Sequence, residues 1–131
     1  MGQPETTPSG FAEEIGVEWI ELDPDDARAR IAVEPRHLQP YGIVHGGVIA
    51  SLAESLTSAA TYGAVRDEGM VAMGQANDTT FLRPIRDGHV NATATPRHRG
   101  RTTWVWDVEI SDDEGRPCAL SRMTIAVRPA R

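Results

Sequence analysis

The chain has 131 residues, a length that suits one domain with a modest core. A net charge of −6 at pH 7 argues against nucleic acid as the main partner, and a single cysteine, Cys118, excludes an internal disulfide and any multi-cysteine metal site. No stretch approaches the roughly 18 apolar residues of a membrane-spanning helix, and the first residues lack the pattern of a signal peptide. We therefore expect a flexible tail over residues 1–10, a single domain over residues 11–131, and a soluble, cytoplasmic protein without a membrane partner.

The first half of the chain predicts a helical turn, two strands and one long helix. A short helical turn leads into a strand at about residues 17–22. Over residues 27–33, apolar side chains alternate with arginines, which is typical of a half-buried strand. A loop containing proline and glycine covers residues 37–44. The only long helix is predicted over residues 46–62, with Gly63 as its C-terminal cap.

The second half predicts four strands, at about residues 70–82, 89–97, 101–110 and 116–127. An Asp-Gly pair at residues 87–88 is a hairpin signal between the first two, so we expect the four strands to meander. In the third, one side carries only large apolar residues: Trp104, Trp106, Val108 and Ile110. This order of elements predicts an α+β fold in which an antiparallel sheet wraps around one long central helix.

The predicted helix has two distinct faces. One is apolar and consists of Val48, Ile49, Leu52, Ala53, Leu56, Ala59 and Ala60. The other has one acid among five hydroxyls and consists of Ser51, Glu54, Ser55, Thr57, Ser58 and Thr61. Solvated helix faces normally carry several charges, so we expect a second subunit to cover this polar face. The alternative is an exposed, serine-rich face.

The start of this helix suits the stabilisation of a developing oxyanion. Gly46 and Gly47 leave backbone N–H groups unpaired at the positive end of the helix dipole, and glycine lets a carbonyl approach closely. Glu54, the candidate catalytic base or nucleophile, lies roughly 12 Å of helix rise away. The two cannot act on one carbonyl within one subunit. A dimer with antiparallel helices would bring them together, which predicts an active site shared between subunits.

Three further polar side chains lie close to this constellation. Ser58 is one turn after Glu54 and is predicted to orient the carboxylate or a water molecule. His45 and Gln39, on the loop before the helix, are predicted to donate hydrogen bonds to substrate. The alternatives are that His45 only caps the helix, that Gln39 is ordinary loop polarity, and that Ser58 only packs.

A basic turn at residues 96–104 contains three arginines and a histidine around Gly100. Such a turn suits a phosphate-bearing ligand, with Arg83 and Arg86 as additional contacts, although a solvated hairpin tip fits the residues nearly as well. The histidines lack metal-ligand spacing, and nucleotide-binding and serine-hydrolase motifs are absent from the sequence. We expect neither a metal nor a separate cofactor.

The segment QPYGIVHGGVIASLAESLTSAA, residues 39–60, contains the pattern Q-P-x-G-x-x-H-G-G followed by L-A-E-S. It resembles the signature of hotdog-fold acyl-CoA thioesterases of the PaaI-like group, of the 1,4-dihydroxy-2-naphthoyl-CoA and 4-hydroxybenzoyl-CoA type. The resemblance extends over residues 15–127. It implies hydrolysis of an acyl-CoA with an aromatic or medium-size acyl group, in dimers that usually stack into tetramers.

The resemblance also implies roles for particular residues. Glu54 would be the nucleophile or general base, and the Gly46 N–H would polarise the thioester carbonyl. Gln39 and His45 would bind that carbonyl or the attacking water, and Ser58 would position the water or the acid. The coenzyme A part of the substrate would lie along Met73, Gly74, Thr80, Phe81, Leu82, Arg83, His98, Arg99, Gly100, Arg101, Thr102 and Thr103.

The chain departs from this family pattern at two places, which bear on acyl specificity and nucleotide contacts. Residues 77–80 read Asn-Asp-Thr-Thr where relatives often read N-x-N-H, and Arg101 stands where a small residue is common. Two other functions compete with hydrolysis. One is a non-catalytic module that binds acyl thioesters as a sensor. The other, an enoyl-CoA hydratase, would need an Asp and His pair near the helix start, and the mid-helix Glu54 argues against it.

Overall fold

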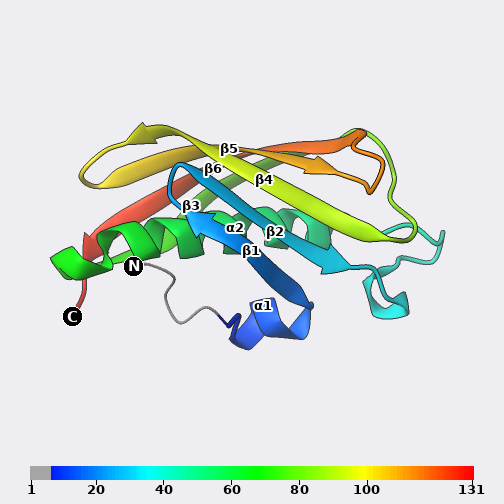
Figure 1. Cartoon of the computed structure of the whole chain (residues 1–131), viewed down its shortest axis with the longest axis horizontal. Helices are drawn as coiled ribbons and strands as arrows, with labels where there is room; N and C mark the ends of the chain where they lie inside the picture. Colours follow the sequence, from blue (N-terminus) through cyan, green and yellow to red (C-terminus); the bar gives the residue numbers. More distant parts are fainter. Residues whose placement is uncertain (1–6) are drawn as a thin grey trace.

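A computed structural model describes residues 7–131, so most of the predicted tail lies outside the described residues. Six antiparallel strands form one sheet in the order β1-β2-β4-β5-β6-β3, and the sheet wraps around the long helix α2 (Figure 1). The α+β prediction of a sheet around one central helix is confirmed. The elements are α1 (Gly10–Glu14), β1 (Val17–Asp23), β2 (Asp26–Ala32), η1 (Pro35–His37), α2 (Gly46–Val65), η2 (Arg66–Glu68), β3 (Met70–Phe81), β4 (His89–Arg99), β5 (Thr103–Ser111) and β6 (Pro117–Pro129).

The core lies between the concave side of the sheet and α2. The predicted alternation is confirmed in β2 and β5, whose apolar side chains are buried against the helix. Trp104 and Trp106 contact each other in this core, with ring centroids 6.0 Å apart. Removal of apolar surface from water is the main force that holds such layers together. No helix among residues 7–131 is long and apolar enough to cross a membrane.

The predicted meander of four strands is wrong for β3. β4, β5 and β6 do follow one another in the sheet, but β3 pairs with β6 at the sheet edge and β4 pairs with β2. The Asp-Gly signal reports a turn, at which Gly88 has a φ of +74°, and it says nothing about which strands pair. The loop before it is anchored instead by Ile85, which is buried and whose carbonyl accepts the N–H of Val44 at 2.8 Å.

The predicted end of the long helix is also wrong. Gly63 lies inside α2, which continues to Val65 and passes into η2. The glycine that ends this run is Gly69, with a φ of +74° in the left-handed region. A left-handed C-cap requires that conformation, and Gly63 does not adopt it.

The polar face of α2 is not one surface. Thr57 and Thr61 are fully buried beneath the sheet, so the prediction that a second subunit covers them is wrong. Their hydroxyls are satisfied within the chain: Thr57 donates to the carbonyl of Ala53 at 2.9 Å, and Thr61 to that of Thr57 at 2.7 Å. Buried threonine fits a helix only when its hydroxyl is bonded in this way. Only the part of the face around Glu54 stays open.

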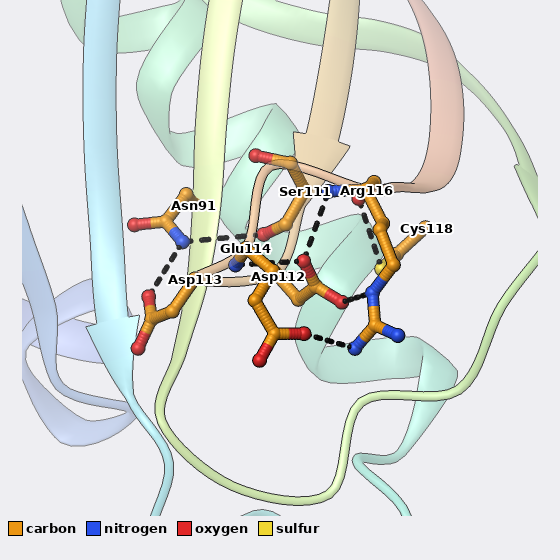
Figure 2. A network of polar contacts seen from close by, with 7 residues as sticks. All are labelled: Asn91, Ser111, Asp112, Asp113, Glu114, Arg116 and Cys118. Carbon is orange, nitrogen blue, oxygen red and sulfur yellow. Dashed lines mark hydrogen bonds and ion pairs between the residues drawn. The ribbon is translucent and has the colours of Figure 1, made fainter.

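The turn between β5 and β6 is held by Asp112 (Figure 2). Its carboxylate accepts the backbone N–H groups of Glu114 and Arg116, at 3.0 and 2.9 Å, and the Arg116 guanidinium at 2.7 Å. Just beyond the turn, Cys118 is buried, and burial raises the pKa of its thiol. A thiol in that state is a poor nucleophile.

Candidate active site

Within residues 7–131, the start of α2 leaves one backbone donor free. His45 is the N-cap: its Nδ1 accepts the N–H of Gly47 at 2.8 Å, and its carbonyl accepts that of Val48 at 2.9 Å. The N–H of Gly46 has no partner among residues 7–131. An unpaired N–H at the positive end of a helix binds an oxyanion well.

His45 caps the helix, which is one of the two roles that the sequence left open for it. Because Nδ1 accepts a hydrogen bond, the neutral ring carries its proton on Nε2, as assigned from the hydrogen-bond pattern. The ring therefore keeps a free donor, and its side chain is exposed. Capping and substrate binding do not exclude each other at this residue.

The loop before α2 is fixed by buried His37. Its Nδ1 accepts the N–H of Glu34 at 2.9 Å, and its Nε2 lies 2.8 Å from the carbonyl of Ile15. Its own carbonyl accepts the N–H of His45 at 2.8 Å. This brings half-buried Gln39 beside the start of the helix. Gln39 and the helix start line one hollow of about 460 Å³, the Gln39 hollow, made by Gln39, Ile43, Val44, Gly46, Ile49, Phe81, Leu82, Arg83, Pro84 and Ile85.

Glu54 lies two turns along α2 and faces β3. A Cβ atom on Gly74 would stand 2.5 Å from its Oε2, so the absence of a side chain at Gly74 makes room for the carboxylate. The Nδ2 of Asn77 donates to Oε1 at 3.2 Å. A second hollow of about 470 Å³, the Glu54 hollow, is lined by Gly47, Ala50, Ser51, Glu54, Asn77, Thr79 and Phe81.

A β-bulge in β3 brings both of these contacts to Glu54. Gly74 and Asn77 are three residues apart, and in a regular strand they would face opposite sides of the sheet. The pairing with β6 shifts between Gly74 and Ala76, which leaves Gln75 as the extra residue. Gly74 then pairs with Ile125 and Asn77 with Met123, both of which are buried on the helix side. Bulges often re-aim side chains next to active sites.

Phe81 separates the two hollows. It ends β3 with its ring over the helix start, where a Cβ atom on Gly46 would stand 2.8 Å from Cζ. Both hollows include Phe81 in their lining, and its side chain is about half exposed. Glu54 and the free N–H of Gly46 therefore face different spaces within one chain.

The structure places the remaining predicted site residues in several positions. Ser58 is half-buried one turn after Glu54, and no hydrogen bond joins the two within residues 7–131. Thr80 lies on the outer face of the sheet and Met73 is exposed near the C-terminus. The backbone N–H groups of Leu82 and Arg83 both donate to the carbonyl of Cys118, at 2.8 and 3.1 Å.

The basic turn is not near Glu54 in one chain. It joins β4 to β5 and lines a hollow with Ala64 and Val65, roughly 15 Å of helix rise beyond Glu54. Arg99 is already occupied: its guanidinium pairs with Asp25 and lies 5.3 Å from the ring centre of Trp104. Arg101 makes no ion pair within the described part of the chain. The turn therefore joins Glu54 at one site only if two chains contribute.

Sequence reasoning missed Asn77. It was noted only as a departure from the family pattern, because a strand read with strict alternation gives no reason to pair it with Glu54. A bulge changes which side chains share a face, and a reading by strict alternation does not include it. The sequence feature that indicates the bulge is Gly74, a glycine inside a strand and next to a polar run. Within residues 7–131, no three His, Cys, Asp or Glu side chains are placed to hold a metal ion.

Comparison with known proteins decides the family. Residues 41–119, more than half of the chain, match the family model described as the thioesterase superfamily. The chain belongs to the thioesterase superfamily. Its fold is the hotdog fold of these enzymes, and thioester hydrolysis is the activity class of its relatives.

Individual relatives of this thioesterase cover most of its length. The proofreading thioesterase EntH of Cronobacter turicensis is 36% identical over 122 residues, which are 93% of this chain and 88% of that one. A solved structure of a variant of thioesterase PA1618 from Pseudomonas aeruginosa has a TM-score of 0.87 at 37% identity, covering 92% and 86%. The PaaI protein of E. coli, from the phenylacetic acid degradation operon, has a TM-score of 0.78 at 31% identity, covering 88% and 81%.

Proposed function

We propose that this thioesterase hydrolyses an acyl-CoA with an aromatic or medium-size acyl group to the free acid and coenzyme A. Glu54 acts as nucleophile or general base, and the N–H of Gly46 polarises the thioester carbonyl. The observation that carries the proposal is the N–H of Gly46 at the start of α2, which has no partner within residues 7–131 and lies beside the Gln39 hollow. A backbone donor of this kind stabilises the oxygen on which negative charge develops.

Two side chains add donors to the same carbonyl site. Gln39 lines the hollow that contains Gly46. The Nε2 of His45 carries the proton of the neutral ring because Nδ1 accepts in the cap, and Nε2 has no partner among residues 7–131. Removing one donor of an oxyanion hole typically costs about a hundredfold or more in kcat. Gly46, Gln39 and His45 together form the carbonyl-binding half of the site.

Glu54 has to come from a second copy of the chain. It faces a different hollow from Gly46 of its own chain, and roughly 12 Å of helix lies between them. β3 is an exposed edge strand, and its free backbone groups suit pairing with another copy about a two-fold axis. We therefore propose a homodimer with a shared site, with dimers associating into tetramers.

Two balanced routes fit a carboxylate at this position. In the first, a Glu54 oxygen attacks the thioester carbon, the C–S bond breaks, coenzyme A leaves as thiolate, and water then hydrolyses the mixed anhydride. In the second, Glu54 takes a proton from water, which attacks the carbon directly, and the proton passes to the leaving sulfur. Ser58 positions the water or the acid in either route, and Arg83 and Arg101 are available for the phosphates of coenzyme A.

Release of free thiol from a panel of aryl- and alkyl-CoA thioesters, followed with a thiol-reactive dye, tests the proposal. Glu54→Ala and Glu54→Gln should lower kcat by about a hundredfold or more. Glu109→Ala, which removes an exposed glutamate on β5, is the matched control and should keep parental activity. Because the thiol of Cys118 is buried, the protein itself should react little with the dye, and the background signal should be low.

Two results would contradict the proposal. Glu54 variants that retain parental kcat would remove the carboxylate from the mechanism. A parent that binds the thioesters but releases thiol from none of them would assign the protein to the sensor class. Among active substrates, the ranking of kcat/KM identifies the acyl group, and parallel assays with acyl carrier protein thioesters identify the carrier.

A further inference from the structure

We propose that Asn77 is a positioning residue for Glu54, and that Thr79 and Ser121 hold the Asn77 amide in the orientation this requires. The proposal rests on the proposed function, since it concerns how the Glu54 carboxylate is presented to the thioester. Asn77 does not touch the substrate in this scheme. It acts through the carboxylate.

The orientation of the Asn77 amide follows from its partners. Its Nδ2 lies 3.0 Å from the carbonyl of Ala50 and 3.2 Å from Oε1 of Glu54. A carbonyl and an ionised carboxylate can only accept, so both must face the NH2 group, which has two hydrogens to give. The opposite amide orientation would place an oxygen against two acceptors and lose both bonds. The donor side of Asn77 therefore faces α2.

A hydroxyl relay fixes the other side of the amide. The Oδ1 of Asn77 lies 2.6 Å from Oγ1 of Thr79, which lies 2.8 Å from Oγ of Ser121 on the neighbouring strand β6. The Thr79 hydroxyl has one proton, which it gives to the Asn77 oxygen, so it accepts from Ser121. Ser121 is buried, which anchors the relay in the sheet. Hydrogen bonds in such a chain strengthen one another.

This arrangement makes the two oxygens of Glu54 different. Oε1 receives the N–H of Asn77, a bond to a charged acceptor, which is stronger than a neutral one. Oε2 lies on the side of Gly74, where no side chain stands. The geometry assigns Oε2 as the oxygen that attacks the thioester or takes the proton from water, while Oε1 is held.

The fixed carboxylate suits either route of hydrolysis. A reacting oxygen must sit within a few tenths of an ångström of its productive position, and a side chain with free rotors seldom does so unaided. Glu54 is exposed on the surface of a single chain, so packing within that chain does not hold its carboxylate. The bond from Asn77 supplies that restraint, and it also ties β3 to α2 through Ala50.

The test compares two nearly isosteric variants, Asn77→Leu and Asn77→Asp. Leucine removes both N–H donors, and aspartate keeps the shape and the Thr79 contact but places a carboxylate against Glu54. We expect kcat to fall roughly tenfold or more in Asn77→Leu and further in Asn77→Asp, with KM nearly unchanged, because orientation acts on the chemical step. Asn77→Ser, which restores a short hydroxyl donor, should recover part of the loss.

Asn91 provides the matched control. Its Nδ2 also donates to a backbone carbonyl, that of Ser111 at 3.3 Å, and to a carboxylate, that of Asp113 at 3.0 Å (Figure 2). Asn91→Leu and Asn91→Asp remove the same pair of bonds far from Glu54 and should leave kcat and KM unchanged. Thr79→Val, which breaks the relay but leaves Asn77 in place, should lower kcat less than Asn77→Leu.

Each outcome decides the matter. Asn77 variants that keep parental kcat while Glu54→Ala is inactive would overturn the positioning role and leave the proposed function standing. A rise in KM at unchanged kcat would place Asn77 in binding and also overturn it. A parent that hydrolyses none of the thioesters defeats the proposed function itself, and that result is obtained without any Asn77 variant.

Discussion

The indole N–H of Trp106 on β5 donates a hydrogen bond of 2.9 Å to the hydroxyl of Thr61 on α2. Both side chains are fully buried. Thr61 passes its own proton to the carbonyl of Thr57, so each polar atom of this contact between sheet and helix is satisfied. The bond explains why a threonine rather than an aliphatic residue occupies the inner side of the helix at this turn.

Thr61→Val should destabilise the protein by about 1–3 kcal/mol, because the indole N–H of Trp106 would lose its acceptor in the core. Thr57→Val is the control. The hydroxyl of Thr57 donates to carbonyls of its own helix, those of Ala53 and Glu54, and no buried side-chain donor within residues 7–131 depends on it, so its loss should cost less. Urea unfolding followed by tryptophan fluorescence measures both. Equal free energies of unfolding for Thr61→Val and the parent would show that the buried bond contributes nothing.

Gly74→Ala should lower kcat/KM by roughly tenfold or more, because the new methyl group would stand 2.5 Å from Oε2 of Glu54 and displace the carboxylate. The substitution lies on an exposed part of the edge strand, so the free energy of unfolding should change little. Steady-state thiol release and urea unfolding separate the two effects. Parental activity in Gly74→Ala would mean that the carboxylate has room elsewhere and that Oε2 reacts without lying beside Gly74.

Gly63→Ala should stabilise the protein by about 0.5–1 kcal/mol, because this glycine is inside α2 and alanine favours helix. A Cβ atom there meets nothing within 4 Å, so no steric cost opposes the gain. Thermal melting compares it with the parent. A loss of stability would point to a left-handed Gly63, the conformation that a C-terminal cap at this residue requires.

Asp112 should make stability depend on acid pH. Burial alone would raise the pKa of this carboxyl, but the N–H groups of Arg116 and Glu114 and the Arg116 guanidinium together lower it below 3.8. A pKa that is lower in the folded chain stabilises the fold above about pH 4, and that contribution is lost as pH falls through the folded value. Asp112→Ala should therefore melt below the parent at pH 7, and the difference should narrow at pH 3. A difference that is constant with pH would contradict the ionic role of Asp112.

Much of the fold follows from short-range pattern. Alternation in β5 identified Trp104 and Trp106 as core residues, and the run from Gly46 identified the helix. Strand order did not follow, because a turn such as that at Gly88 reverses the chain without choosing a partner strand. The burial of Thr61 did not follow either. A hydroxyl counts as polar in any pattern, and only the position of Trp106 across the core gives it a partner.

Part of the candidate site likewise follows from local sequence, and part depends on long-range contacts. The N–H of Gly46 and the carboxylate of Glu54 are properties of one helix and could be found from its sequence. The contact of Glu54 with Asn77 depends on long-range pairing between β3 and β6, and on the irregularity within it, which local pattern does not encode. The sequence also shows that the turn at residues 96–104 is basic. It does not show that Arg99 pairs with Asp25, which is distant in the chain.

The extra residue in β3 has a consequence for how the chain tolerates changes in length. Deleting Gln75 would leave Gly74 and Asn77 two residues apart on the same side of a regular strand, so their pairing with Ile125 and Met123 would stay as it is. Deleting Asp78 would instead make Asn77 and Thr79 adjacent and put them on opposite faces, so that either the carboxylate of Glu54 would lose its donor or Phe81 would leave the start of α2. For this protein, the place of a length change in β3 matters more than the change itself, because one residue is dispensable at the bulge and none is dispensable between Asn77 and Phe81.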